Sequence, residues 1–226
     1  MSEIRTIILN RSVADSLEEE AELYRKELKE KKTFLLNVMS SPGSGKTTTL
    51  IKLINLLKKD YRIGILEADI DSDVDAIKVS KETGVPSIQL HTGGMCHLDA
   101  SMTSQGVSEL VNQFGGHFDF IVLENIGNLV CPAEFDTGAS LNMVILSVPE
   151  GSDKPLKYPL MFEKSDLVLI NKIDTIEFFN FDYNIVENFI YKRNPKAKIF
   201  RVSAKKDIGL GEVAHYLAAL IDEWRK

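Results

Sequence analysis

Ser40-Ser-Pro-Gly-Ser-Gly-Lys-Thr47 follows the apolar run Phe34-Leu-Leu-Asn-Val-Met39 and precedes residues 50–57, where apolar side chains recur at helical spacing. A glycine-rich turn between a strand and a helix is typical of a phosphate-binding loop. Its backbone N–H groups can surround phosphate oxygens, and the positive end of the helix dipole points at them. A Gly/Ser linker that contains a lysine by chance does not explain why a strand and a helix flank it. The stretch therefore predicts binding of a nucleoside triphosphate with Mg²⁺.

The residues of this loop have separate expected roles. Lys46 is expected to reach the β- and γ-phosphates, and the Thr47 hydroxyl is expected to ligate Mg²⁺. Ser40 stands where the pattern G-x-x-x-x-G-K-[ST] has its first glycine, and a small serine can still fit the tight turn. The candidate phosphate-binding residues are Gly43, Ser44, Gly45, Lys46, Thr47 and Thr48.

Length and composition limit the possible classes of protein. The chain has 226 residues, of which 44% are hydrophobic, enough for a substantial core. A net charge of −6 argues against a nucleic-acid binder, which normally has a basic face. No apolar run reaches the length of a membrane span, no secretory signal pattern begins the chain, and two cysteines offer little for a disulfide framework. A cytoplasmic, reducing location is expected, with no membrane and no nucleic-acid partner.

Strand-like and helix-like segments alternate along the chain. Several strands are apolar on both faces, which is typical of a parallel sheet covered by helices on both sides. The predicted strands are 33–39, 62–68, 86–91, 118–124, 143–148, 166–171 and 197–203. The predicted helices are 13–32, 46–58, 74–83, 98–113, 155–164, 182–193 and 211–225. The pattern predicts an α/β P-loop NTPase fold as a single domain, 1–226, with residues 1–32 as an N-terminal helical extension that covers the nucleotide domain.

A second motif indicates which base is bound. Asn171-Lys-Ile-Asp174 ends the apolar strand 166–170, and N-K-x-D at such a place is the guanine-recognition signature of GTPases. The Asp174 carboxylate can accept from both guanine N1–H and the exocyclic amine, whereas adenine offers no such pair. Lys172 would lie along the base, and Asn171 would brace the loops. Ser203-Ala204-Lys205 follows the last strand and matches the loop whose backbone touches the guanine oxygen. A small-molecule kinase on the same loop is disfavoured, because kinases mostly use ATP.

Acidic residues at two other strand ends suit magnesium, which prefers hard oxygen ligands and keeps several waters. Glu124 ends the strand 118–124 and can hold a Mg²⁺-bound water, while the N–H of Gly127 can sense the γ-phosphate. Asp69 follows the strand 62–68 and is the second expected magnesium-side residue. Asp75 could act on the attacking water or across an interface. The candidate catalytic residues are Lys46, Asp69, Asp75 and Glu124.

The other aspartates of this stretch, Asp71 and Asp73, are better explained by loop solvation and helix capping. No residue stands out as an arginine finger or as a water-positioning glutamine. Intrinsic hydrolysis is therefore expected to be slow, with a partner or a second copy completing the site.

Both cysteines lie near residues that could take part in metal or nucleotide binding. Cys96-His97 follows Thr92-Gly-Gly-Met95, and Cys131-Pro132 lies shortly after Gly127. Thiolate and imidazole suit Zn²⁺ and Ni²⁺, but the customary C-x-x-C pairs are missing. Spacing alone favours two buried structural thiols and a surface histidine. Three ligands are also one fewer than a closed tetrahedral site requires, a shortage that a site shared between two protomers would remove.

Four runs together resemble the HypB family of hydrogenase nickel-incorporation GTPases, which are related to the urease accessory protein UreG. They are Ser40-Ser-Pro-Gly-Ser-Gly-Lys-Thr-Thr-Thr49, Thr92-Gly-Gly-Met-Cys-His-Leu-Asp99, Glu124-Asn-Ile-Gly-Asn-Leu-Val-Cys-Pro-Ala133 and Asn171-Lys-Ile-Asp174. The resemblance covers residues 13–226, and the family also has serine at the place of Ser40.

The resemblance implies a GTP-dependent homodimer that helps to deliver nickel during [NiFe]-hydrogenase maturation. The expected cofactors are GTP or GDP, Mg²⁺, and Ni²⁺ or Zn²⁺. The family's metal site maps onto Cys96, His97 and Cys131, at or near a dimer interface. The expected partners are nickel-delivery proteins and the precursor of the hydrogenase large subunit. A GTP-gated interaction scaffold with a purely structural zinc, or a urease-type accessory GTPase, is the alternative.

The chain departs from some family members at its N-terminus. Residues 1–32 contain neither Cys nor His, so the N-terminal nickel-binding motif or histidine-rich tract of those members is missing from this stretch. Metal handling is therefore expected to run through the cysteines and histidine of the nucleotide domain. In the family a lysine after Glu-Gly can reach the partner's nucleotide, which here would be Lys157 or Lys154.

Overall fold

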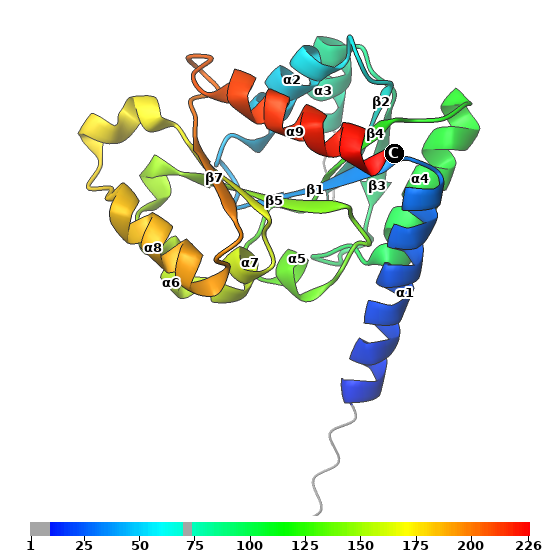
Figure 1. The fold of residues 1–226 in the computed structure, drawn as a ribbon, viewed down its shortest axis with the longest axis horizontal. Coiled ribbons are helices and arrows are strands. Elements are labelled where there is room, and N and C mark those ends of the chain that lie inside the picture. Colours follow the sequence, from blue (N-terminus) through cyan, green and yellow to red (C-terminus); the bar gives the residue numbers. More distant parts are fainter. Residues whose placement is uncertain (1–9, 70–73) are drawn as a thin grey trace, which may run out of the picture.

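Seven parallel strands form one sheet within the residues described by the computed structural model, 10–69 and 74–226, in the order β3-β2-β4-β1-β5-β6-β7 (Figure 1). The strands are β1 (Phe34–Ser40), β2 (Ile63–Asp69), β3 (Ser87–His91), β4 (Phe120–Glu124), β5 (Leu141–Ser147), β6 (Leu167–Asn171) and β7 (Lys198–Arg201). The helices are α1 (Asn10–Glu30), α2 (Lys46–Leu57), α3 (Val74–Thr83), α4 (Ala100–Phe114), α5 (Cys131–Glu134), α6 (Lys154–Lys157), α7 (Pro159–Glu163), α8 (Tyr183–Arg193) and α9 (Leu210–Trp224). Two 3₁₀ helices are η1 (Val148–Glu150) and η2 (Ile173–Phe178).

Helices cover both faces of the sheet, because successive side chains of a strand point to opposite faces. Leu36 and Val38 of β1 pack with α2, α3 and α9 on one side. Leu35 packs with α1 and α4 on the other side, where Met39 meets α5, α7 and α8. The continuous apolar runs of the sequence thus fill two helical layers, as predicted for a parallel sheet.

The carboxyl ends of β1, β4 and β2 lie beside one another in the centre of the sheet. The chain leaves β1 toward β2 on one side, whereas β5 pairs with β1 on the other side. In an open α/β sheet the loops diverge at such a point and leave a crevice for ligands. The fold therefore concentrates the loops of the candidate site at this edge.

The predicted strands and the longer helices are confirmed, with ends shifted by a few residues. The prediction of one helix over 155–164 was wrong: the chain forms α6 and α7, separated at Tyr158. The residue before a proline is sterically disfavoured in the helical region, and Tyr158 before Pro159 takes φ −123° and ψ 60°. The short helix α5 and both 3₁₀ helices were not predicted.

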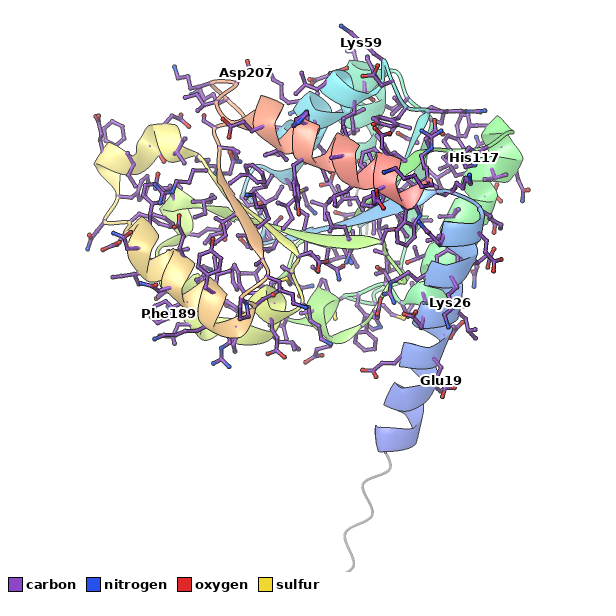
Figure 2. All side chains as sticks on the ribbon, in the orientation of Figure 1. Glu19, Lys26, Lys59, His117, Phe189 and Asp207 are labelled. Atoms are coloured by element: carbon purple, nitrogen blue, oxygen red, sulfur yellow. The ribbon has the colours of Figure 1, made fainter. Side chains whose placement is uncertain are left out.

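Helix α1 lies along the body of the protein with one apolar stripe inward. Ala21, Tyr24 and Leu28, which recur at three- and four-residue steps, are buried against α4 and the sheet. Glu19 and Lys26 lie on its exposed side (Figure 2). Among the described residues, no helix combines the length and the apolar character that crossing a membrane would need.

Candidate nucleotide and metal site

The phosphate-binding loop turns at its glycines. The positive backbone angles fall on Gly43 (φ 77°) and Gly45 (φ 95°), and not on Ser40, the last residue of β1. Serine is therefore compatible with the place where the common pattern has glycine. A side chain at Gly45 would put its Cβ 2.5 Å from Nδ2 of Asn171, so the turn also needs glycine for space.

Lys46 and Thr47 of the loop face the end of β4. The ammonium group of Lys46 lies 3.3 Å from Oε1 of Glu124 and donates to the carbonyl oxygen of Asn125 over 2.5 Å. The Thr47 hydroxyl lies 3.4 Å from the same Oε1. Glu124 is only 3% exposed, and its second carboxylate oxygen has no hydrogen-bond partner among the described residues.

This arrangement fits the expected magnesium ion. A buried carboxylate oxygen without a donor is costly in free energy, and a hydroxyl with a carboxylate is the kind of hard oxygen pair that Mg²⁺ prefers. Thr47 and Glu124 would hold the ion or its waters. When bound, the ion would neutralise charge on the β- and γ-phosphate oxygens.

A pocket of about 490 Å³ lies at this edge of the sheet, and most of the predicted phosphate-side residues line it. They are Gly43, Gly45, Lys46, Thr47, Thr48, Asp69, Glu124 and Gly127. Ser44 of the loop is buried, and its hydroxyl oxygen has no hydrogen-bond partner among the described residues. Asp71 and Asp73 lie outside the described residues. Asp75 belongs to the first turn of α3, and its side chain also lies outside the described part.

The expected guanine loops are tied to the phosphate-binding loop by Asn171. Its Nδ2 donates to the carbonyl oxygen of Ser44 over 3.0 Å, and its Oδ1 accepts from the backbone N–H of Ala204 over 3.1 Å. Lys172 takes a left-handed conformation (φ 60°) and donates to the carbonyl oxygen of Gly43 over 2.6 Å. One buried amide thus joins three loops that are far apart in the sequence.

Asp174 is oriented by the loop after β7. The hydroxyl of Ser203 donates to Oδ1 of Asp174 over 2.5 Å, and this bond holds the pKa of the carboxyl below its usual range. An ionised carboxylate is the form that can accept from two guanine N–H groups.

The two cysteines come together although 35 positions separate them. Their sulfur atoms lie 2.7 Å apart, and both thiols are free. The sulfur of Cys96 beside it, together with burial, raises the pKa of the Cys131 thiol. His97 points elsewhere: its ring stacks on Phe135, with 3.5 Å between ring centroids. Across the described residues, no three His, Cys, Asp or Glu side chains gather as a metal-holding group.

Asn128, which was not predicted as a site residue, holds the two cysteine segments in place. Its Nδ2 donates to the carbonyl oxygen of Cys96, and its Oδ1 accepts from the backbone N–H of Cys131, each over 2.9 Å. It directly follows Gly127, which lines the nucleotide pocket and lies close to Pro42 of the phosphate-binding loop. The segment 127–131 therefore spans from the nucleotide pocket to both thiols.

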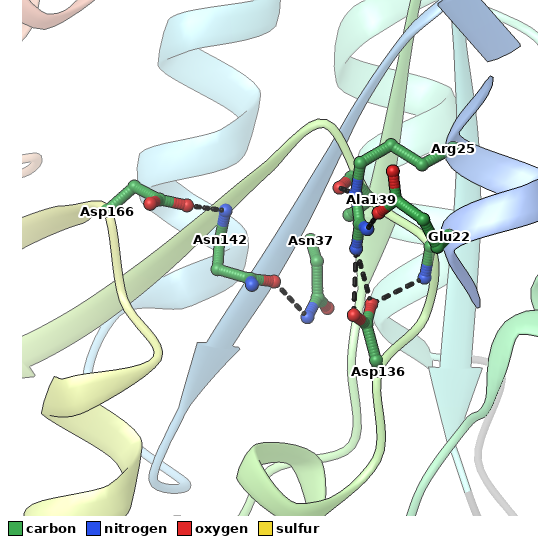
Figure 3. Close-up of polar contacts among 8 residues, drawn as sticks. Glu22, Arg25, Asn37, Asp136, Ala139, Asn142 and Asp166 are labelled. Carbon is green, nitrogen blue, oxygen red and sulfur yellow. Dashed lines mark hydrogen bonds and ion pairs between the residues drawn. The ribbon is translucent and has the colours of Figure 1, made fainter. Parts of the chain in front are cut away.

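Arg25 of α1 anchors the segment that follows α5. Its guanidinium donates to both carboxylate oxygens of Asp136 over 2.8 Å and to the carbonyl oxygen of Ala139 over 2.8 Å (Figure 3). Both bonds to Asp136 come from Nη2 and the bond to Ala139 comes from Nε, so the guanidinium is held at two of its nitrogens. The predicted packing role of α1 thus includes a polar clamp next to the helix that begins at Cys131.

Three polar side chains that line the pocket, Glu67, Lys78 and Gln89, were not predicted as site residues. For Glu67 and Gln89, the sequence offers only their positions near the ends of parallel strands, where ligand-binding loops lie. Lys154 and Lys157 are on α6, where Lys157 pairs with Asp153 over 2.5 Å.

Comparison with known proteins places the chain in a family. Residues 34–201 match the family described as "CobW/HypB/UreG, nucleotide-binding domain". A hydrogenase maturation factor HypB from Azotobacter chroococcum is 46% identical over 179 residues, 79% of this chain and 57% of the relative. The chain thus spans little more than half the length of that relative. A hydrogenase/urease maturation factor HypB from Helicobacter pylori is 44% identical over 87% of this chain and 80% of its own.

Two solved structures are also similar. HypB from Helicobacter pylori in complex with nickel has a TM-score of 0.85 and 39% identity, over 92% of this chain and 96% of its own. The hydrogenase maturation factor HypB from Archaeoglobus fulgidus has a TM-score of 0.80 and 32% identity, over 92% and 99%. Sequence, fold and the order of motifs agree, and the chain belongs to the HypB family of hydrogenase maturation factors within the CobW/HypB/UreG group.

Proposed function

We propose that this chain is a GTP-hydrolysing metallochaperone that assists nickel insertion into [NiFe]-hydrogenase. Residues 1–226 would act as one GTPase domain with residues 1–32 as its N-terminal extension. GTP state would be coupled to dimerisation and to metal binding at Cys96, His97 and Cys131. The nickel complex of the Helicobacter pylori relative supports nickel as the cargo.

The observation that carries the proposal is the short path from nucleotide to thiols. Gly127 lines the nucleotide pocket, and the next residue, Asn128, is hydrogen-bonded to the backbone of both Cys96 and Cys131. A γ-phosphate that draws in the N–H of Gly127 would move the residue that sets the spacing of the two thiols. Coupling between two binding sites is reciprocal, so bound metal would also change the affinity for nucleotide.

His97 would join the thiols in the dimer. Its ring is stacked on Phe135. Among the described residues of one protomer, no third His, Cys, Asp or Glu side chain joins the two thiols as a metal ligand. Soft thiolates and imidazole suit Ni²⁺ and Zn²⁺. A second copy that contributes its own set would complete the coordination, which links metal loading to dimerisation.

Individual residues have proposed roles in GTP binding and hydrolysis. Lys46 would stabilise charge on the β- and γ-phosphates, and Asp69 and Glu124 would hold the magnesium side. Asp75 would act on the attacking water or across an interface. Asn171, Lys172, Asp174, Ser203 and Ala204 would select guanine.

A nickel titration tests the proposal. Purified protein is titrated with Ni²⁺ in the presence of GDP or of a non-hydrolysable GTP analogue, and its mass in solution is measured in parallel. We expect at least a fivefold difference in nickel affinity between the two nucleotide states. The Cys96→Ala/Cys131→Ala and His97→Ala variants should lose nickel, whereas His215→Ala, an exposed histidine of α9, should keep it. Equal nickel affinity and equal mass in both states would favour a scaffold with a structural metal instead.

A further inference from the structure

Lys78 is a second cation at the nucleotide pocket. It belongs to the second turn of α3, its side chain is exposed, and it lines the same pocket as Lys46 of the phosphate-binding loop. Lys46 is held at the end of β4 by Glu124 and by the carbonyl oxygen of Asn125. The pocket therefore has cations on two helices, and only one of them belongs to the phosphate-binding motif.

Helix α3 is held against α2, the helix that begins at Lys46 (Figure 1). Val79, the neighbour of Lys78, is fully buried in the core cluster that contains the apolar side chains of α2. At the far end of both helices, the ammonium group of Lys58 donates to the carbonyl oxygen of Thr83 over 2.8 Å. These contacts fix the position of Lys78 relative to the phosphate-binding loop.

The side chain of Lys78 extends toward the edge of the sheet where the pocket lies. Helices α2 and α3 follow the carboxyl ends of the parallel strands β1 and β2, so both helices begin at this edge. Lys78 stands four residues after Val74, about 6 Å from the start of α3 along its axis. Each Cα–Cβ bond of a helix tilts toward the N-terminus, which directs a long lysine side chain back over this distance.

The strand order indicates which end of a nucleotide would meet Lys78. Asn171 ends β6, and Ser203 and Ala204 follow β7, so the expected guanine loops lie on one side of β1. Strands β4, β2 and β3 lie on the other side, and α3 connects β2 to β3. A nucleotide with its base near β6 and its phosphates on the loop after β1 would therefore direct its terminal phosphate toward β4, β2 and Lys78.

We propose that Lys78 binds the γ-phosphate of GTP from α3, across the pocket from the phosphate-binding loop, and so helps the protein to distinguish GTP from GDP. The inference rests on the nucleotide site proposed above. An ammonium group and a phosphate oxygen form a charge-assisted hydrogen bond, which is stronger than a neutral one. The pocket is also lined by the carboxylates of Glu67, Asp69 and Glu124, which repel a triphosphate, so a second cation lowers the cost of binding it.

The competing explanation is that Lys78 only neutralises the carboxylates of the pocket. A lysine with that role would raise the affinity for GDP and GTP alike, because both carry negative phosphates. A contact with the γ-phosphate would affect GTP alone, since GDP lacks this group. Comparison of the two nucleotides therefore separates the two roles.

The test measures binding of fluorescent GDP and of a fluorescent, non-hydrolysable GTP analogue at saturating Mg²⁺. Lys78→Met removes the charge but keeps the length of the side chain, and Lys78→Arg keeps the charge. We expect Lys78→Met to lower the affinity for the GTP analogue roughly tenfold and the affinity for GDP by less than about twofold, with an unchanged Tm. Lys78→Arg should retain most of the affinity. Lys81→Met removes the same charge from the same helix outside the pocket lining, and it should behave like the wild type.

Three results would overturn the inference. The first is an unchanged affinity of Lys78→Met for the GTP analogue, in a wild type that binds both nucleotides. The second is an equal loss of affinity for GDP and for the analogue, which would show that Lys78 only neutralises the pocket. The third is a wild-type chain that binds neither nucleotide, which would refute the proposed nucleotide site and this inference with it. Single-turnover hydrolysis of GTP gives an independent reading, because its rate should fall in Lys78→Met and not in Lys81→Met.

Discussion

Asn37 and Asn125 are joined through their side-chain amides inside the protein. Nδ2 of Asn125 donates to Oδ1 of Asn37 over 3.0 Å, and the two residues are 0% and 2% exposed. Asn37 in turn donates to Oδ1 of Asn142 over 2.9 Å (Figure 3). Because the carbonyl oxygen of Asn125 accepts from Lys46, this amide chain supports the loop that meets the phosphate-binding lysine.

The first prediction concerns this amide chain. Asn37→Leu keeps a similar volume but leaves Nδ2 of Asn125 buried without a partner, which costs about 1–3 kcal/mol of unfolding free energy. Urea unfolding followed by circular dichroism measures the change. Asn112→Leu on the exposed side of α4 should change stability by no more than about 0.5 kcal/mol. Equal stability of the two variants would show that the buried bond contributes nothing.

The second prediction concerns the turn at Gly45. In Gly45→Ala the new Cβ would stand on a left-handed backbone and lie 2.5 Å from the amide of Asn171. The substitution should therefore lower GDP affinity at least tenfold, about 1.4 kcal/mol of binding free energy. Gly43→Ala has a positive φ but nothing within 4 Å of the new Cβ, so it should cost only backbone strain, about 1–2 kcal/mol of stability.

Calorimetric titration with GDP checks the effect on affinity. Gly211→Ala in α9 has neither a positive φ nor a close neighbour, and it should match the wild type. If the clash with Asn171 causes the effect, Gly45→Ala should have the lowest GDP affinity of the three variants. Equal GDP affinities for Gly45→Ala and Gly43→Ala would contradict it.

The third prediction tests the assigned base. Asp174→Asn replaces an acceptor by an amide that can donate to the second carbonyl of xanthine. Loss of a charge-assisted hydrogen bond costs about 1.5–3 kcal/mol, so GTP affinity should fall roughly 10- to 150-fold while xanthosine triphosphate binds better. Competition binding with both nucleotides measures the exchange. Asp60→Asn, an exposed carboxylate before β2, should retain the preference for GTP.

The fourth prediction follows from the lowered pKa of the Asp174 carboxyl. A carboxyl whose pKa is lowered in the folded state contributes to folding stability. This contribution is present above the ordinary pKa of about 3.9 and is lost as the pH falls through the lowered pKa. Ser203→Ala removes the bond that causes the depression, so the pKa of Asp174 should rise toward the ordinary range. Carbon-13 titration of the carboxyl measures it, with Ser108→Ala on α4 as control. A pKa of Asp174 that stays low in Ser203→Ala would assign the effect to the charges of Lys205 and Lys206 instead.

The fifth prediction concerns Asn128. Asn128→Ala removes both bonds to the cysteine segments, so nickel affinity should fall and its difference between GDP and GTP analogue should shrink below fivefold. GTP affinity itself should change little, because Asn128 does not line the nucleotide pocket. Parallel titrations with nickel and with nucleotide provide the measurement, and Asn184→Ala on α8 is the exposed control. A variant that keeps the full nucleotide dependence would place the coupling elsewhere.

Much of the fold could be predicted from local pattern. The strand and helix around Gly43 to Thr47 are short-range features, and so is the apolar stripe of α1 at Ala21, Tyr24 and Leu28. The break at Tyr158-Pro159 was equally local and was missed, because the apolar spacing of residues 155–164 outweighed the proline. Helix boundaries depend on such single residues more than helix existence does.

The sequence by itself determined which chemical groups are present and in what order. Its phosphate-binding loop and its guanine motif are each contained in a few neighbouring residues, and each cysteine lies in its own short run. Only the tertiary structure decided which groups meet. Strand register places Glu67 beside Glu124. The loops after β3 and β4 place Cys96 next to Cys131, and Asn128 is hydrogen-bonded to the segment of Cys96. The physical reason is that pairing in a parallel sheet joins segments that are distant in the chain, so no local pattern fixes their neighbours.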